Sequence, residues 1–293
     1  MEALTQDQKA FYEANGYLVL EGRVPQPVLE EMRTEIARFD TVASAMTVSD
    51  ERIDLEDSHA PGAPRVRRVK RPDTQSDVFA RLMRSDAILA PVRDLIGPDL
   101  RLQTSKLNMK SAGYGAAVEW HQDWAFYPHT NDDLLAVGVM IDDMAEENGP
   151  LMVFPGTHKG PVLDHHQDGV FVGAVDLATA GFDVADAAVL TGPAGSISIH
   201  HVRTLHGSAL NRSDRPRRIC FYEILAADSF PILGGMTNLA SMEEYDARML
   251  CGRPTKEPRL RPAPVRVPLP LPEKAGSIYE VQSGLKSRAF ERA

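Results

Sequence analysis

The sequence predicts an α+β fold built around an antiparallel sheet or barrel. Helical spacing of apolar residues dominates roughly the first hundred positions, and short strand-like runs then alternate with turn signals. Helices followed by a series of strands are typical of this class. Because no repeat, low-complexity tract or linker interrupts the sequence, we expect residues 1–293 to form one domain.

The first expected helix lies near the N-terminus and is followed by a strand. Thr5 can cap this helix, Gln8 stands at the capping-box position, and Gly16 can end it. The apolar run 17–20 has the length of a short strand. Residues 26–39 again show helical spacing, so we expect a second helix there.

A loop and a third helical region are expected before the strands begin. The acidic segment 40–63 has no period, and we interpret it as a long loop and a candidate lid. Residues 76–97 are expected to be helical, with a break near Ser85-Asp86.

Six later runs have the composition of strands and are separated by turn residues. They cover 102–109, 117–123, 136–142, 151–154, 196–200 and 218–225. Asn148-Gly149 favours a hairpin that sets the register of strands flanking a site. The proline-rich tail 253–272 is expected to wrap the surface in extended form.

Charge and composition argue against several classes of function. The formal net charge is −9, whereas general nucleic-acid binding needs a basic surface. No apolar run approaches the roughly 20 residues that span a membrane, and the polar N-terminus is not typical of a secretory signal. The two cysteines, Cys220 and Cys251, cannot form a disulfide framework, so we expect a cytoplasmic protein with reduced thiols.

One short motif has the composition of a metal site. His121 and Asp123 lie two residues apart in a predicted strand, so their side chains would project from the same face. An imidazole and a carboxylate, joined by a second imidazole, form the facial triad of non-haem Fe(II) oxygenases. By itself this spacing also fits a hydrogen-bonded pair on a barrel strand.

A second motif offers another imidazole and a cation. In the run 200–218, His206 is followed by Arg217, which enters a predicted strand. A guanidinium meets a carboxylate with two parallel hydrogen bonds, so Arg217 could hold the far end of an iron-bound keto acid. Arg217 has the strand parity expected to face the barrel interior, whereas Arg218 has the opposite parity and is expected at the surface.

Together these motifs resemble the phytanoyl-CoA dioxygenase family of Fe(II)- and 2-oxoglutarate-dependent oxygenases, which includes ectoine hydroxylase. The matching stretches are, in order, WHQDW with the following FYPH, then DDMAEENGPLMVFPGTHKG, then LHGSALNRSDRPRR. The resemblance is good over about 100–226 and looser over the N-terminal helices. It implies a double-stranded β-helix, a jelly-roll or cupin-like barrel, with N-terminal flanking helices.

The resemblance also implies roles for individual residues. His121, Asp123 and His206 would bind Fe(II), and Arg217, assisted by Ser208, would bind the distal carboxylate of 2-oxoglutarate. O₂ would be consumed, and succinate and CO₂ released. Related halogenases replace the carboxylate ligand with a small residue, and this chain keeps Asp123. We therefore expect hydroxylation of a small or medium-sized organic substrate, with desaturation or ring formation as the alternatives.

Other side chains near the motifs are candidates for binding. Lys106 shares a strand face with Asn108 and Lys110 and could bind an acid group, including one of 2-oxoglutarate, whereas we expect Lys110 to be solvated. Trp124 and His129 are candidate substrate contacts, although aromatic side chains here fit a barrel core equally well.

The remaining histidines are weaker candidates. His200 and His201 are alternatives to His206 as the second imidazole, but ordinary strand positions suit them better. His158 is expected at the surface or beside the site, and His165-His166 in a solvated loop.

The basic run 65–71 is dense for an acidic chain. A solvated strand or loop face is the usual explanation. The alternative is that this run lies over the mouth of the active site and steers an anionic substrate.

Two other functions fit parts of the pattern. A Zn or Mn cupin-type hydrolase or isomerase would not need Arg217. A catalytically silent metal-binding or sensor protein would not need all four of His121, Asp123, His206 and Arg217. The oxygenase is the prediction that uses every group, with a small-molecule substrate and neither nucleic acid nor membrane as partner.

Overall fold

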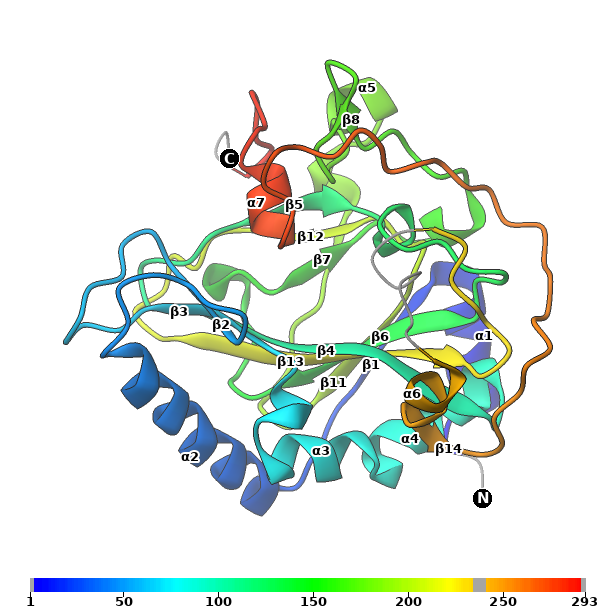
Figure 1. Ribbon diagram of the computed structural model, residues 1–293, viewed down its shortest axis with the longest axis horizontal. Coiled ribbons are helices and arrows are strands. Elements are labelled where there is room, and N and C mark those ends of the chain that lie inside the picture. The colour runs from blue at the N-terminus through cyan, green and yellow to red at the C-terminus, as the bar shows by residue number, and fades with distance from the viewer. Residues whose placement is uncertain (1–2, 234–240, 291–293) are drawn as a thin grey trace.

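The computed structural model describes residues 3–233 and 241–290. Two antiparallel sheets face each other, and helices cover the outer face of the larger one (Figure 1). The larger, major sheet has the order β1 (Tyr17–Leu20), β11 (Ile197–His201), β6 (Leu134–Met140), β13 (Arg217–Ala226), β4 (Leu100–Lys110), β3 (Val66–Lys70), β2 (Ile53–Leu55), and β14 (Met249–Cys251) also pairs with β4. The smaller, minor sheet has the order β10 (Ala188–Val189), β7 (Leu151–Val153), β12 (His206–Ser208), β5 (Val118–His121). The predicted double-stranded β-helix is confirmed.

The predicted N-terminal helices are also confirmed. They are α1 (Gln6–Asn15), α2 (Gln26–Ala43), α3 (Asp77–Met83) and α4 (Asp86–Ile96). In α1 the Thr5 side chain accepts from the Gln8 N–H, the Gln8 side chain accepts in return, and Gly16 ends the helix at φ 77°. Short helices follow at α5 (Leu177–Ala180), α6 (Met242–Asp246) and α7 (Ile278–Gln282). Among the helices described here, none is both long and apolar enough to cross a bilayer.

The main core lies between α2, α3, α4 and the outer face of the major sheet. Along α2 the buried side chains are Leu29, Met32, Ile36 and Phe39, which recur at helical spacing. Burying each contributes about 1.5–3 kcal/mol. Because the helices occupy that face, the inner face of the sheet is left for the space between the two sheets.

The segment 40–63 is not the single loop that we expected. Helix α2 continues to Ala43, and β2 pairs with β3 inside the segment. The acidic residues explain the difference, since Asp54 on β2 binds Arg68 at 2.6 Å and Lys70 at 2.7 Å. Charge pairing across the two strands therefore replaces the missing apolar period.

Asn148-Gly149 does not close a hairpin, so that prediction is wrong. The strands before and after it lie in different sheets, β6 in the major and β7 in the minor. The chain crosses between them through the 3-10 turn η3 (Glu146–Asn148) and Gly149 at φ 69°. This crossing brings the Gly149 carbonyl into the space between the sheets.

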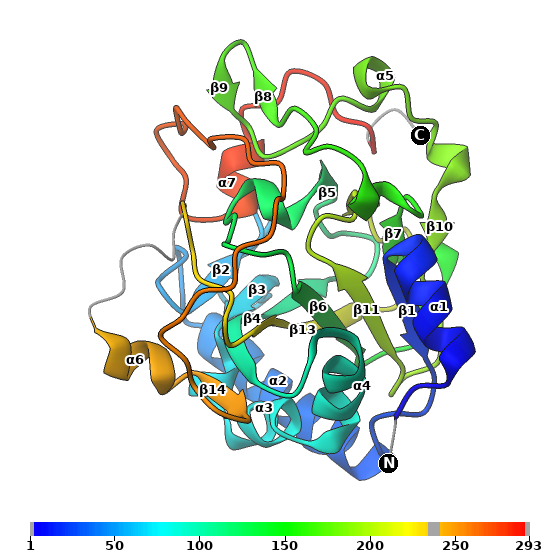
Figure 2. The same ribbon diagram turned by 90° about the vertical axis from the view of Figure 1, so that its right-hand side faces the viewer.

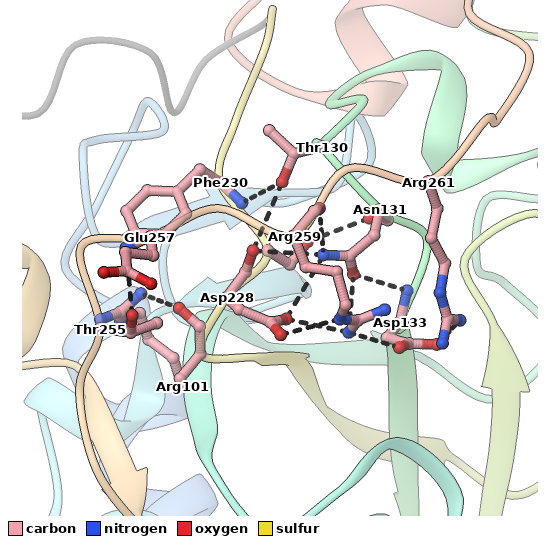
Figure 3. Close-up of polar contacts among 12 residues, drawn as sticks. Arg101, Thr130, Asn131, Asp133, Asp228, Phe230, Thr255, Glu257, Arg259 and Arg261 are labelled. Atoms are coloured by element: carbon pink, nitrogen blue, oxygen red, sulfur yellow. Dashed lines mark hydrogen bonds and ion pairs between the residues drawn. The ribbon is translucent and has the colours of Figure 1, made fainter.

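The proline-rich tail is extended, as predicted, and Arg259 attaches it to the barrel. Figure 3 shows the Arg259 guanidinium between two acids: Nε lies 2.8 Å from Asp228 Oδ2 and Nη2 lies 2.6 Å from Asp133 Oδ2. Asp228 follows β13 and Asp133 precedes β6. These charge-assisted bonds fix the tail to the ends of two central strands.

The chain then returns to the minor sheet, where its last described residues pack beside β5 (Figure 2). Gln282 on α7 is buried, accepts from the Glu119 N–H at 3.0 Å and donates to the Gly173 carbonyl at 2.9 Å. Phe290 stacks on Trp120 with ring centroids 5.4 Å apart. Residues far apart in sequence thus hold the strand that carries the metal motif.

His165 holds the end of the same strand and is not in the solvated position that we expected. It is 1% exposed, its Nε2 accepts from the Gln122 N–H at 2.9 Å, and its Nδ1–H donates to the Leu163 carbonyl at 2.9 Å. Because Nε2 accepts a hydrogen bond, it carries no proton, and the ring is neutral. Burial lowers the pKa of His165 to about 3.

This histidine should make the protein less stable in mild acid. The pKa of an unfolded histidine is about 6.5, so between that pH and 3 the unfolded chain binds the extra proton. The contribution of His165 to the free energy of unfolding is therefore complete above pH 6.5. It is lost as pH falls, by up to about 1.4 kcal/mol per pH unit. Urea unfolding between pH 7.5 and 4.5 should show a shallower slope for His165→Gln than for the wild type. His166→Gln, one residue along and partly exposed, is the matched control. Equal slopes in all three proteins would contradict the assignment.

Candidate functional site

The predicted metal ligands meet where β5 ends and β12 begins. His121 is the last residue of β5, His206 is the first of β12, and the two are direct partners with ring centroids 4.1 Å apart. Asp123 is not on the strand, as we had expected, but opens the 3-10 turn η2 (Asp123–Ala125). Its carboxylate still reaches both rings, with Oδ1 3.6 Å from His121 Nε2 and Oδ2 3.8 Å from His206 Nε2.

The backbone orients both imidazoles for metal binding. Nδ1 of His121 lies 2.7 Å from the Glu119 carbonyl, and Nδ1 of His206 lies 2.9 Å from the Thr204 carbonyl. In each ring Nδ1–H donates to that carbonyl, which leaves the Nε2 lone pair available. One ligand atom from each of His121, Asp123 and His206 lies within 4.8 Å of the others. Two imidazoles and one carboxylate are a donor set that fits Fe(II) and leaves positions open.

The protonation states also suit a metal. Burial alone would raise the pKa of the Asp123 carboxyl, but His206, Lys106 and the contact with His121 bring that pKa well below its usual value. Burial, together with the neighbouring His121, lowers the pKa of His206 well below its usual value. Near neutral pH the site therefore offers an ionised carboxylate and a neutral imidazole.

A cavity lies beside these three residues, between the two sheets. Its other lining residues are Arg68, Lys106, Asn108, Val118, Ala136, Leu151, His200, Gly207, Ser208, Arg217, Ile219, Phe221 and Ile278. Of the residues predicted from the sequence, Lys106, Ser208 and Arg217 are thus gathered with the three metal-site residues around one space.

Arg217 is a buried cation without an acidic partner. It is 3% exposed, and Nε and Nη2 donate to the Gly149 carbonyl at 3.0 and 2.6 Å. No carboxylate forms an ion pair with it within the described residues, and burial lowers its pKa to about 10. Arg218 has the opposite parity, as predicted, and is partly exposed, where it forms a two-pronged ion pair with Asp142 at 2.7 and 2.5 Å.

Of the two lysines of β4, Lys106 faces the cavity as we expected and Lys110 lies differently from what we expected. Lys110 is 2% exposed rather than solvated, and its Nζ donates to Ser208 Oγ at 2.9 Å and to the Ala209 carbonyl. Lys106 lines the cavity and pairs with the buried carboxylate of Glu223 at 2.7 Å. Glu223 also accepts from the Tyr127 hydroxyl at 2.8 Å.

Trp124 and His129, the predicted substrate contacts, do not line this cavity. Trp124 is fully buried, and its indole N–H donates to the Pro264 carbonyl of the tail at 2.8 Å. His129 is 1% exposed and hydrogen-bonded through Nδ1 to the Tyr127 carbonyl. They were predicted because they follow the metal motif closely in sequence, with core packing as the alternative. The chain turns after His121 and directs both side chains into packing.

Several residues of the site escaped the sequence analysis. His200 was considered only as an alternative ligand, yet it lines the cavity without belonging to the metal-ligand set. Glu223 shares the parity of Arg217 on β13, so strand alternation could have suggested it. Ile278 on α7 reaches the cavity from the C-terminal segment, and no local pattern signals this.

Comparisons with known proteins agree with this geometry. The family model described as phytanoyl-CoA dioxygenase matches residues 12–219. A probable alpha-ketoglutarate-dependent hypophosphite dioxygenase from Stutzerimonas stutzeri is 35% identical over 97% of this chain and 99% of its own length. An L-proline trans-4-hydroxylase from Streptomyces griseoviridis is 30% identical over 72% of this chain and 82% of its own.

A crystal structure of EctD from S. alaskensis with bound Fe supports the fold. It has a TM-score of 0.67 at 22% identity and covers 90% of this chain and 89% of that chain. The fold, the family model and the two relatives point to the same group of enzymes. The chain therefore belongs to the phytanoyl-CoA dioxygenase family of Fe(II)- and 2-oxoglutarate-dependent dioxygenases.

Proposed function

We propose that His121, Asp123 and His206 bind the Fe(II), and that Arg217, assisted by Ser208, binds the distal carboxylate of 2-oxoglutarate. The observation that carries this proposal is the convergence of two available Nε2 atoms and an ionised carboxylate on the cavity that also contains a buried arginine. When bound, the iron and 2-oxoglutarate supply the oxidation, with release of succinate and CO₂.

The chain's own groups orient these partners. The carbonyls of Glu119 and Thr204 fix the two rings, and the Gly149 carbonyl holds Arg217 in the cavity. A carboxylate of 2-oxoglutarate would give this guanidinium the charged partner that it lacks among the described residues. Ile278 belongs to the C-terminal segment that packs on the barrel, so we propose that residues 1–293 act as one domain.

We further propose that the substrate is a small anion. A groove lined by Arg52, Arg68, Lys70, Arg71 and Lys106, with Glu51 and Glu223 as its acids, meets the cavity at Arg68 and Lys106. Cationic side chains thus outnumber acids along this route, although the whole protein is acidic. Positive potential in a groove attracts and steers anions.

Some residues of the basic run 65–71 are used in ion pairs within the fold, and others line this route. Arg67 forms ion pairs with Glu56 and Asp57. Arg68 pairs with Asp54 but also borders the cavity. Arg71 forms no ion pair within the described chain and borders the groove. Arg68 and Arg71 are therefore the residues of this run that we propose to steer the anion.

Hypophosphite is the first substrate to test, because the relative named for it matches almost the whole chain. The proposed reaction inserts oxygen into a P–H bond of hypophosphite. This inorganic anion takes the place of the organic substrate that we expected from the sequence. Succinate release should be measured with hypophosphite, phosphite, L-proline and ectoine, each with and without Fe(II). Turnover of the zwitterions L-proline or ectoine without turnover of either phosphorus oxyanion would contradict the anionic class.

The first prediction concerns the metal ligands. His121→Ala, Asp123→Ala and His206→Ala should each abolish substrate-dependent succinate release and weaken Fe(II) binding, because each removes one of three donors. Circular dichroism should show that the fold survives. Full activity in any variant would remove that residue from the proposed ligand set.

The second prediction separates two neighbouring arginines. Arg217→Ala should weaken 2-oxoglutarate binding by on the order of 2–5 kcal/mol, the usual cost of removing one member of a buried charged pair. Arg218→Ala, whose side chain binds Asp142 outside the cavity, should leave that affinity nearly unchanged. Anaerobic titration with 2-oxoglutarate measures both, and the reverse order would refute the assignment of Arg217.

The third prediction concerns anion entry. Arg68→Gln and Arg71→Gln should each raise KM for hypophosphite roughly three- to tenfold and leave KM for 2-oxoglutarate nearly unchanged. The effect of Arg71→Gln should shrink with added salt, because exposed charges are screened. Arg65→Gln is the matched control, since Arg65 belongs to the same run but lies over Tyr114. An equal effect in the control would remove the groove from the proposal.

A further inference from the structure

His200 is a polar side chain in a position where the fold does not need one. It lies on β11, is 1% exposed and lines the cavity. The nearby lining residues Ala136, Ile219 and Phe221 are apolar. An apolar side chain would therefore complete this wall, and the imidazole needs another explanation.

Neither ring nitrogen of His200 has a hydrogen-bond partner within the described chain. The nearest acid is Asp123, whose Oδ2 lies 3.6 Å from Nε2, beyond hydrogen-bond range. The ring otherwise contacts His206, at 4.4 Å between centroids, and the edge of Phe221, at 6.0 Å. Buried polar groups in proteins are nearly always paired, so an unpaired one facing a cavity points to a ligand.

That ligand is not the iron. The three ligand atoms that gather within 4.8 Å come from His121, Asp123 and His206, and His200 is not in that group. A fourth protein ligand would also occupy one of the positions that 2-oxoglutarate and O₂ need. His200 is therefore available to a molecule bound beside the metal.

The sheet leaves room for such a molecule next to His200. His200 pairs with Ala136 on β6, and Ala136 pairs with Glu223 on β13, which binds Lys106. Two strand spacings of roughly 4.8 Å separate the backbones of His200 and Glu223, and the residue between them has the smallest side chain. In the adjacent row the Phe221 ring fills the space over Gly138, where an added Cβ would come within 2.7 Å of it, so the free space lies over Ala136.

We propose that His200 is a specificity-determining residue that donates a ring N–H to an oxygen of the anionic substrate. The anion lies above Ala136, with His200 on one wall and Lys106 on the other. This inference deepens the proposed function and rests on it. The His200 side chain would then be the group that discriminates between an oxyanion and an apolar molecule of the same size.

The test uses the full chain loaded anaerobically with Fe(II) and 2-oxoglutarate, with sodium hypophosphite as the probe. His200→Phe keeps a ring but removes the donor, and it should weaken hypophosphite binding at least tenfold. His200→Asn keeps a donor and should recover part of that loss. Both variants should bind Fe(II) and 2-oxoglutarate as the wild type does, which separates substrate contact from a role in holding Asp123.

His201→Gln is the matched control, because His201 is next in sequence but lies beside Asp132 and His158. It should leave hypophosphite binding unchanged. Unchanged hypophosphite affinity in His200→Phe would overturn the inference, and so would a loss of Fe(II) affinity in that variant. If the wild type binds no anion, the proposed substrate class fails, and the role of His200 fails with it. If the wild type binds and oxidises hypophosphite but His200→Phe does so equally well, only the inference fails.

Discussion

The pairing of β5 with β12 is the constraint on which the site depends. It places His121 directly opposite His206, and a slip of one residue would turn one ring to the other face of the sheet. Both strands are short, so their own hydrogen bonds do little to fix this register. It is secured from outside the sheet, by Gln282 on the Glu119 backbone, by His165 on the Gln122 N–H, and by Phe290 against Trp120.

The major sheet supplies the chemistry around that pair through alternation along its strands. On β13, Arg217, Ile219 and Phe221 line the cavity in turn, while Cys220 and Tyr222 face the helix-covered core. On β6 the facing residues are small: Ala136 lines the cavity, and Gly138 lets the Phe221 ring pack against the sheet. One strand thus brings charge and bulk to the cavity, and its neighbour accommodates them. Neighbouring strands of the inner face therefore have different roles: β13 supplies charged and bulky side chains, and β6 supplies small ones.

The sequence predicted the parts of the site that depend on local spacing. His121, His206, Arg217 and the cavity position of Lys106 follow from motif order and strand parity. Asp123 was assigned correctly to the group but placed on a strand that ends two residues earlier. Trp124 and His129 were proposed because they are close to the motif in sequence, and closeness in sequence does not decide which way a side chain points after a turn. His165 and Ile278 were beyond local reasoning, because their positions depend on segments that return to β5 from far along the chain.

The C-terminal segment has a practical consequence for anyone handling the enzyme. Ile278 lines the cavity, Gln282 braces the strand that ends at His121, and Phe290 is buried against Trp120. A substitution or insertion within residues 278–290 would therefore disturb the wall of the active site itself. Low activity in a variant altered in this segment would not by itself mean that the wrong substrate had been tried.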